Sequence, residues 1–306
     1  MKTGYNISKQ AGQLLLVWAL LGSTVAAQEP TPADQYNSAK DCDYLASQAE
    51  QATFVLYLPT QEKWLVCNQA RAEQPVLPAS TFKIPHALIA LETGVIEDEF
   101  KQEQSDGKTR AVPVWNQPTS LASGMTNSTV WFYQRLAERI GIQKEREWLQ
   151  RLGYGNADMG KDTELTTFWL TGALRISALE QVRFIDRLRR HDLPASVANQ
   201  NRVAAMMAGR ISPDSDAVSK LHAKSGAVLP IGTDGDISKG VAAEQMLAGL
   251  DQVGWYVGWV DRSDEKGGDA VFALHLVMST PDALAKRKAL AAYMLQANGV
   301  ATEKAE

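Results

Sequence analysis

Ser80 and Lys83 are the residues of this chain whose types and spacing most suggest catalysis. They stand three residues apart in the stretch LPASTFKIPHALIALETG, residues 77–94, where apolar residues recur at helical spacing. That spacing places both side chains on one face of a helix, near its positive N-terminal end. Apolar neighbours would keep the lysine amine uncharged, and an uncharged amine can take a proton from a serine hydroxyl. The alternative is a helix cap beside a lysine whose amine extends to solvent.

The S-x-x-K spacing also occurs twice elsewhere in the chain, as SDGK (105–108) and SDEK (263–266). Both matches lie in polar, turn-like segments, where a lysine stays hydrated and protonated and cannot act as a base. The sequence context, and not the spacing alone, therefore selects Ser80 and Lys83.

Three further segments carry polar groups that could serve such a nucleophile. Ser128 and Val130 are predicted at the start of a second helix, Trp169 lies in an apolar, loop-like stretch, and Lys224, Ser225 and Gly226 lie on a predicted strand. Taken singly, Ser128 fits a helix cap, Trp169 a core residue and Lys224 a charge at a sheet edge. The four histidines lack paired metal-ligand spacing and are predicted to be ordinary surface or core residues: His86, His191, His222 and His275.

Together these segments resemble the class D β-lactamases, or oxacillinases, of the serine β-lactamase and penicillin-binding protein superfamily. The motifs that carry the resemblance are STFK (80–83), STV (128–130), YGN (154–156), FWL (168–170) and KSG (224–226). Similar sequence runs from about Phe54 to the last predicted helix. Two features depart from the pattern, because KSG replaces the commoner KTG and the connection from Gly226 to Gly254 is long. The substrate range is therefore not carried over from the family.

The resemblance implies a role for each matching residue. Ser80 would attack the β-lactam carbonyl and carry the acyl group, while Lys83 would take up carbon dioxide and act as a carboxylated general base. Trp169 would donate its N–H to that carboxylated lysine, and Val130 would help to keep the pocket dry. The resemblance implies no metal and no cofactor other than carbon dioxide or bicarbonate.

The remaining roles concern the leaving group and the substrate. Ser128 would pass a proton to the lactam nitrogen and Lys224 would tune that hydroxyl. The backbone N–H groups of Ser80 and Ala227 would form an oxyanion hole. The substrate-binding residues would be Ser225, Gly226 and Arg287.

The order of predicted elements indicates an α/β fold of the α+β type. Strands are predicted near 52–59, 63–69, 221–227, 254–261 and 270–279, and helices at 80–93, 128–140, 143–152, 177–190 and 281–297. We expect one largely antiparallel sheet, built from about 50–75 and 215–306, flanked by helices that include the C-terminal one. An all-helical subdomain is inserted between the two parts.

The first 27 residues are predicted to be a cleavable signal peptide, which leaves a single catalytic domain over 28–306. They carry Lys2, Lys9, an apolar run and small residues before a cleavage site after Ala27. We therefore expect export to the periplasm and a mature protein outside the membrane. Removing two lysines and no acid takes the formal charge from −4 to −6, which disfavours nucleic-acid binding.

The chain contains two cysteines, Cys42 and Cys67. In an oxidising compartment they either form a disulfide or remain separate thiols, with Cys67 buried in a strand. The oligomeric state, monomer or homodimer, stays open.

Three other functions compete with β-lactam hydrolysis and antibiotic resistance. A penicillin-binding D,D-peptidase shares the serine and lysines but deacylates slowly, and a β-lactam sensor domain would normally be tethered to a membrane. A secreted binding protein without catalysis leaves the motif set unexplained. A class A β-lactamase is disfavoured, because its motifs need asparagine where Val130 and Phe168 stand.

Overall fold

The structure, a computed structural model, describes Met1 and residues 36–49, 51–110, 112–214, 219–228, 253–262, 267–277 and 281–300, with the backbone alone for 281–285. The part from residue 36 onward belongs to one compact unit, Gln35–Glu306. The predicted signal peptide and most of the long connection after Gly226 lie outside the described residues. The single catalytic domain over 28–306 stays a prediction.

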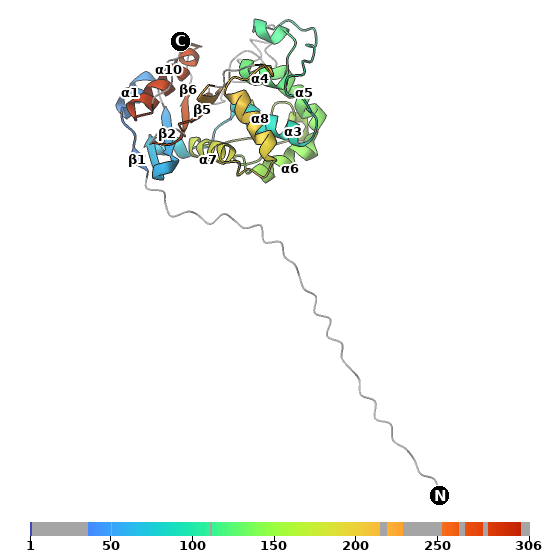
Figure 1. The fold of residues 1–306 in the computed structure, drawn as a ribbon, viewed down its shortest axis with the longest axis horizontal. Coiled ribbons are helices and arrows are strands. Elements are labelled where there is room, and N and C mark those ends of the chain that lie inside the picture. The colour runs from blue at the N-terminus through green and yellow to red at the C-terminus, as the bar shows by residue number, and fades with distance from the viewer. Residues whose placement is uncertain are drawn as a thin grey trace. The chain divides into compact units, whose positions relative to one another are not determined.

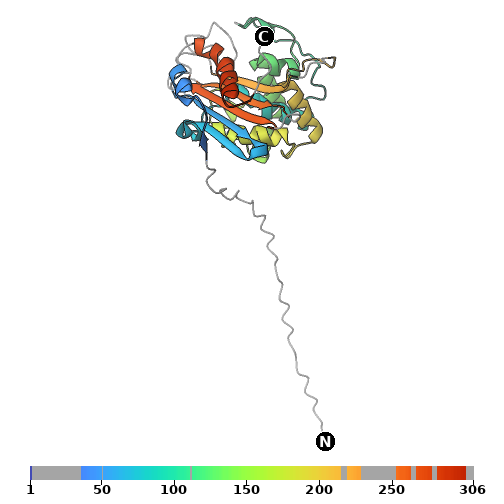
Figure 2. The ribbon, with the colours of Figure 1, turned by 60° about the vertical axis from the view of Figure 1, so that its left-hand side comes forward.

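One sheet in the order β1-β3-β2-β6-β5-β4 forms the centre of this unit. Its strands are β1 (Asn37–Ser38), β2 (Thr53–Leu58), β3 (Lys63–Cys67), β4 (Leu221–Ala227), β5 (Val253–Val260) and β6 (Ala270–Val277). The pairing is antiparallel except between the short β1 and β3. Because β2 pairs with β6, the two ends of the chain share the sheet, as Figure 2 shows. This confirms the predicted fold class.

The helices of the described part lie mostly between β3 and β4. They are α1 (Cys42–Gln48), α2 (Gln69–Glu73), α3 (Lys83–Glu92), α4 (Leu121–Asn127), α5 (Val130–Ile140), α6 (Ile142–Leu152), α7 (Ala178–Arg189), α8 (Val197–Met207) and α10 (Pro281–Ala297). Short 3-10 turns cover Pro59–Gln61, Ala79–Phe82, Pro113–Asn116 and Asp162–Glu164. Figure 1 shows α3, α4, α5, α6 and α8 grouped beside the sheet. This group agrees with the helical insert that the sequence predicted.

Alternate residues of the central strands build two separate cores. Val55 and Ala273 face the helical insert, while Phe54 and Leu274 face α10. This alternation is the period of two of a β-strand, and it places α7 and α10 on opposite faces of the sheet. The helix that begins at Lys83, α3, belongs to the first core.

Several element boundaries differ from those predicted. The predicted helix 80–93 is a 3-10 turn, Ala79–Phe82, followed by α3, so Lys83 begins the α-helix instead of lying one turn inside it. The predicted helix start at Ser128 is wrong, because Ser128 is the left-handed C-cap of α4 and α5 begins at Val130. Ser128 thus lies at a sharp junction between two helices.

Four helices and one strand were not predicted: α1, α2, α4, α8 and β1. They are short or, in the case of α8, weakly amphipathic, so apolar periodicity reveals them poorly. Capping serines mark two of them. Ser120 accepts a hydrogen bond from the Ser123 N–H at the start of α4, and Ser196 accepts one from the Asn199 N–H at the start of α8.

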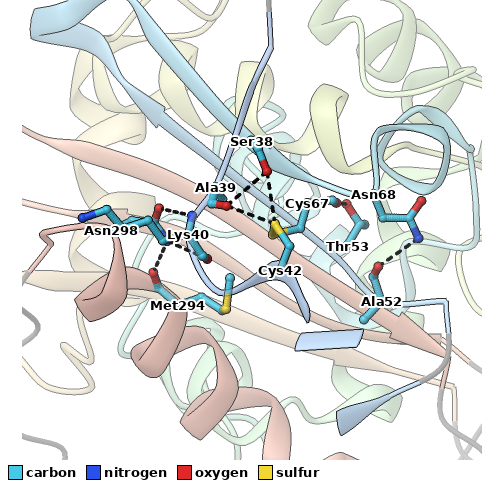
Figure 3. Close-up of a disulfide and its surroundings, with 10 residues drawn as sticks. All are labelled: Ser38, Ala39, Lys40, Cys42, Ala52, Thr53, Cys67, Asn68, Met294 and Asn298. Carbon is cyan, nitrogen blue, oxygen red and sulfur yellow. Dashed lines mark hydrogen bonds between the residues drawn. A yellow bond between two sulfur atoms is a disulfide. The ribbon is translucent and has the colours of Figure 1, made fainter. Parts of the chain in front are cut away.

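The structure joins Cys42 and Cys67 in a disulfide, shown in Figure 3. It connects α1 to the end of β3, and the two Cα atoms lie 5.3 Å apart. Nearby, Asn298 beyond α10 accepts a hydrogen bond from the Lys40 backbone N–H at 2.8 Å. The N-terminal and C-terminal segments of the unit are therefore fixed to each other at this end of the sheet.

Candidate active site

The 3-10 turn before α3 presents Ser80 to Lys83. The Lys83 Nζ lies 3.0 Å from Ser80 Oγ, a hydrogen-bond distance between two side chains of one helical face. Ala79, directly before the serine, has a φ of 49°, which is unusual for a residue with a Cβ. Its N–H donates to the Trp169 carbonyl at 3.0 Å, and this bond helps to hold the unusual conformation.

Lys83 is fully buried among aromatic rings. Its Nζ lies 5.0 Å from the centroid of the Tyr133 ring, and Phe82 beside it stacks on Trp169 with ring centroids 5.3 Å apart. Burial lowers the pKa of Lys83 from 10.5 to about 7. A substantial fraction of this side chain is therefore uncharged at neutral pH, as the apolar context in the sequence predicts.

Ser128 reaches the site from the junction between α4 and α5. Lys224 on β4 donates a hydrogen bond to Ser128 Oγ at 3.1 Å and another to the Ser225 carbonyl at 2.8 Å. Burial lowers the pKa of Lys224 well below its usual value, and the nearby positive charges of Lys83 and Arg287 lower it further. The second serine and second lysine predicted from the sequence are thus brought together.

β4 runs close to the 3-10 turn that carries Ser80. A Cβ added to Gly226 would lie 3.0 Å from Thr81 Cγ2 and 3.1 Å from the Pro78 carbonyl oxygen. Only glycine permits this approach without displacement, which explains its place after Lys224 and Ser225. The approach puts the end of β4, with Ala227, beside the turn that carries Ser80.

Arg287 comes to the same strand from α10. It is buried, its guanidinium donates to the Gly226 carbonyl, and burial lowers its pKa to about 10. Arg287 therefore places a buried cationic group at the end of β4. A buried cation there favours an anionic ligand.

Trp169 is fully buried, and its Nε1 has no hydrogen-bond partner among the described residues. A buried indole N–H without an acceptor is costly, so it points to an acceptor that the unmodified side chains do not supply. Val130, the first residue of α5, is also buried. Both side chains are buried, as the resemblance expects of an apolar wall around Lys83.

A buried network behind the turn contains the tyrosine of the YGN motif. Gln181 on α7 donates to Thr81 Oγ1 at 2.8 Å and to the Tyr154 hydroxyl at 3.3 Å. Thr81 in turn donates to the Pro78 carbonyl at 2.7 Å. This network fixes the turn to α7, and nothing in the spacing of Gln181 predicted it.

The sequence analysis also missed a buried pair, His86 on α3 and Glu145 on α6. The His86 Nε2 lies 2.7 Å from a Glu145 carboxylate oxygen, and both side chains have no exposed surface. The contact lacks the alignment of a hydrogen bond, so the ring and the carboxylate meet by distance alone. A signal existed, because Glu145 occupies an apolar position of α6, in register with Leu149 and Leu152.

The other predicted features lie away from this site or outside the described residues. Ser105 and Lys108 belong to a partly exposed segment. The Lys108 side chain is exposed, with its Nζ 3.9 Å from an Asp106 carboxylate oxygen, which agrees with the predicted hydrated lysine. Ser263 and Lys266 lie outside the described residues. Among the described residues, no group of three or more His, Cys, Asp and Glu side chains is arranged to hold a metal ion.

Comparison with known proteins identifies the class to which this fold and site belong. The model of the penicillin-binding protein transpeptidase domain matches residues 27–296. Within that class, the chain is 39% identical to β-lactamase OXA-20 of Pseudomonas aeruginosa over 76% of both chains. It is 31% identical to OXA-48 of Klebsiella pneumoniae over 92% of this chain and 95% of that one.

Solved structures agree with the sequence comparison. The class D β-lactamase YbXI from Nostoc superposes with a TM-score of 0.72 and 31% identity, covering 85% of this chain and 99% of that one. FUS-1 (OXA-85) from Fusobacterium nucleatum subsp. polymorphum gives 0.70 at 28% identity, covering 85% of this chain and 98% of that one. The chain belongs to the class D β-lactamases, which confirms the family and the enzyme class predicted from its motifs.

Proposed function

We propose that this protein hydrolyses the β-lactam amide of penicillins and related antibiotics through an acyl-enzyme on Ser80, with a carboxylated Lys83 as the base. The observation that carries the proposal is the buried Ser80–Lys83 contact of 3.0 Å. At that distance the hydroxyl proton can pass to the lysine side chain as Ser80 Oγ attacks the carbonyl.

Two features of the pocket support carboxylation of Lys83. The lysine has a pKa of about 7, so it offers the uncharged amine that reacts with carbon dioxide. Trp169 offers a buried N–H that lacks an acceptor among the described residues. Addition of carbon dioxide to Nζ, with loss of a proton, would form a carbamate whose oxygens can accept the serine proton, which an ammonium cannot do. The buried Trp169 and Val130 would keep bulk solvent from it.

The second half of the site serves the leaving group and the substrate. Ser128, hydrogen-bonded to Lys224, is suited to deliver a proton to the lactam nitrogen as the amide bond breaks. The N–H groups of Ser80 and Ala227 would stabilise the oxyanion. Arg287 and Ser225, at the end of β4, would bind the carboxylate that penicillins carry.

Mutation of Ser80 tests the acyl-enzyme. Ser80→Ala should abolish covalent labelling by a penicillin, seen by intact-protein mass spectrometry, while the melting temperature stays close to that of the wild type. The matched control is Ser105→Ala, which alters the other described S-x-x-K pair and should turn over a chromogenic cephalosporin normally. An acyl adduct on the Ser80→Ala protein would refute the assignment.

Labelled bicarbonate tests the base. A carbon-13 carbamate signal should appear in the wild type and disappear in Lys83→Ala, whose activity bicarbonate should not restore. Turnover without any such signal would favour the peptidase-like use of a free lysine. Rapid turnover, as opposed to a stable acyl-enzyme, separates the proposal from both a D,D-peptidase and a sensor domain.

The proposed setting is the periplasm, reached by removal of residues 1–27, where the enzyme would confer antibiotic resistance as a monomer or homodimer. Among the described residues, no helix has the length and apolar character needed to cross a membrane. Mass spectrometry of protein from a periplasmic extract should give an N-terminus at Gln28. A precursor retained in the cytoplasm at full length would contradict export.

A further inference from the structure

Gln181 on α7 is a fully buried polar side chain to which the proposed reaction assigns no role. Its amide nitrogen donates to Thr81 Oγ1 at 2.8 Å and to the Tyr154 hydroxyl at 3.3 Å. Its Oε1 has no hydrogen-bond partner among the described residues, so burying this amide is costly. Thr81 directly follows Ser80 in the 3-10 turn. The N–H contacts to this turn are therefore what the glutamine provides.

The Thr81 hydroxyl extends this contact to the backbone around Ser80. It donates to the Pro78 carbonyl at 2.7 Å, and the Thr81 N–H donates to the same oxygen at 3.2 Å. Both polar groups of Thr81 thus close the turn that contains Ala79 and Ser80. Because a hydroxyl has one proton to donate, the donor from Gln181 and the acceptor at Pro78 together fix its orientation.

Two contacts join the chain around this turn to the start of α7. The first is a backbone pair, in which Val76 and Ile176 exchange hydrogen bonds of 3.0 and 2.9 Å. The second is the bond from Gln181 to Thr81. Ala79, with its φ of 49°, lies in the chain between Val76 and Thr81. A left-handed residue with a Cβ persists only where its surroundings hold it, so loss of the second contact should let the turn relax.

The strand that carries the other half of the proposed oxyanion hole packs on the same turn. A Cβ on Gly226 would lie 3.0 Å from Thr81 Cγ2 and 3.1 Å from the Pro78 carbonyl oxygen. Ala227, whose N–H is proposed to complete the hole, follows Gly226 on β4. The placement of the Ser80 N–H relative to the Ala227 N–H therefore depends on where Thr81 and Pro78 lie.

We infer that Gln181 is a positioning residue for acylation, because its bond to Thr81 holds the turn so that the Ser80 N–H is directed at the oxyanion. The inference rests on the proposed function, since it takes Ser80 as the nucleophile. The oxyanion forms only as the carbonyl is attacked. The bond should therefore favour the transition state and leave the first, noncovalent binding of the substrate unaffected.

The main test is Gln181→Met, which keeps the length of the side chain and removes the N–H donor. The acylation rate constant at saturating penicillin, followed by stopped flow, should fall about tenfold, the scale expected when an oxyanion-hole donor is misaligned but not removed. The affinity for a boronic acid, whose tetrahedral adduct on Ser80 resembles the transition state, should fall by the same factor. The dissociation constant of the noncovalent penicillin complex should stay unchanged.

Thr81→Val tests the route by which Gln181 acts. It removes the hydroxyl that accepts from Gln181 and keeps the shape of the side chain. Because the bond to Pro78 is lost as well, acylation should slow at least as far as in Gln181→Met. In the double variant the two losses should not multiply, since the second change has no bond left to remove. Losses that multiply would mean that the two residues act independently, and would overturn the inference.

The matched control is Gln200→Met on α8. Gln200 is also fully buried, and its amide donates to the carbonyls of Leu193 and Ala195 in the loop before α8. Loss of this amide should lower the melting temperature and leave the acylation rate unchanged at a temperature where the variant is folded. If Gln181→Met also lowers only the melting temperature, its role is structural and the inference is wrong.

Peptide mass mapping of the penicillin adduct separates a failure of the inference from a failure of the proposed function. A wild-type protein that is not acylated at Ser80 would overturn both together. Acylation of Ser80 at the same rate in the wild type and in Gln181→Met would overturn the inference alone.

Discussion

The chemistry of this site depends on how few polar contacts its buried groups have. Lys83 has lost its hydration, and Trp169 has an N–H without an acceptor among the described residues. Each of these features is unfavourable for folding taken alone, because desolvating an amine or leaving a donor unpaired costs free energy. Together they suit the pocket to the proposed reaction, in which an uncharged Lys83 takes up carbon dioxide and Trp169 donates to the anion that forms.

The pKa of Lys83 gives a pH prediction. Below about pH 7 the side chain becomes an ammonium, which neither accepts a proton from Ser80 nor reacts with carbon dioxide. Turnover should therefore be full above this pKa and fall as the pH drops through it, with added bicarbonate moving the acidic limb to lower pH. Initial rates with a chromogenic cephalosporin, at fixed total bicarbonate, provide the measurement. A rate independent of pH from 5 to 8 would contradict a lysine base.

At the scale of elements, the site exists because three backbones meet. The turn before α3 supplies Ser80, the junction of α4 and α5 supplies Ser128, and β4 supplies Lys224. The first two elements depend on left-handed backbone at Ala79 and Ser128, where φ is 49° and 57°. The close approach of β4 depends on Gly226.

Gly226→Ala tests this approach. The new Cβ would lie about 3 Å from Thr81 and the Pro78 carbonyl, so β4 must move away from the turn by a few tenths of an ångström. Because the proposed oxyanion hole spans the two elements, we expect acylation to slow by roughly 10- to 100-fold. Stopped-flow acylation rates measure the effect, and the melting temperature shows whether the fold is retained. An unchanged acylation rate would mean that the two backbones have more freedom than this packing indicates.

At the scale of the whole unit, the two ends of the chain support each other. β2 and β6 are neighbours in the sheet, and the Cys42–Cys67 bridge holds α1 against the same end, near Asn298. Cys67 belongs to the core on the α10 face, whereas α3 and the nucleophile belong to the core on the opposite face. Stability and catalysis are thus partly separated in space.

Removing the bridge should affect stability more than turnover. The cysteines are 25 residues apart, so Cys42→Ser/Cys67→Ser should lower the free energy of unfolding by about 3 kcal/mol in the chain-entropy model. Urea denaturation of oxidised wild type and of the double variant measures the difference. At low temperature the folded variant should keep its acylation rate. Equal stability of the two proteins, or two titratable thiols in denatured, unreduced wild type, would show that the bridge does not form in solution.

The sequence by itself determined the family and the fold class, and it singled out Ser80 and Lys83 as the candidate nucleophile and base. These follow from short-range information, because residue types, spacing and apolar periodicity lie within single elements. The sequence also contained a sign of the buried His86–Glu145 pair, since Glu145 stands at an apolar position of its helix. It did not reveal that His86 is the residue in contact with Glu145. The short helices α1, α2 and α4 escaped because propensity is weak where tertiary packing stabilises an element.

Only the tertiary structure decided how the groups meet. Ser128 and Lys224 are 96 residues apart in the chain but 3.1 Å apart in space, and His86 and Glu145 come from different helices. The left-handed backbone at Ala79 and Ser128 has no signal in residue type, since neither is glycine. The loss of hydration that lowers the Lys83 pKa comes from α5, the Trp169 segment and β4 closing around it, so it is a property of packing and not of any one segment.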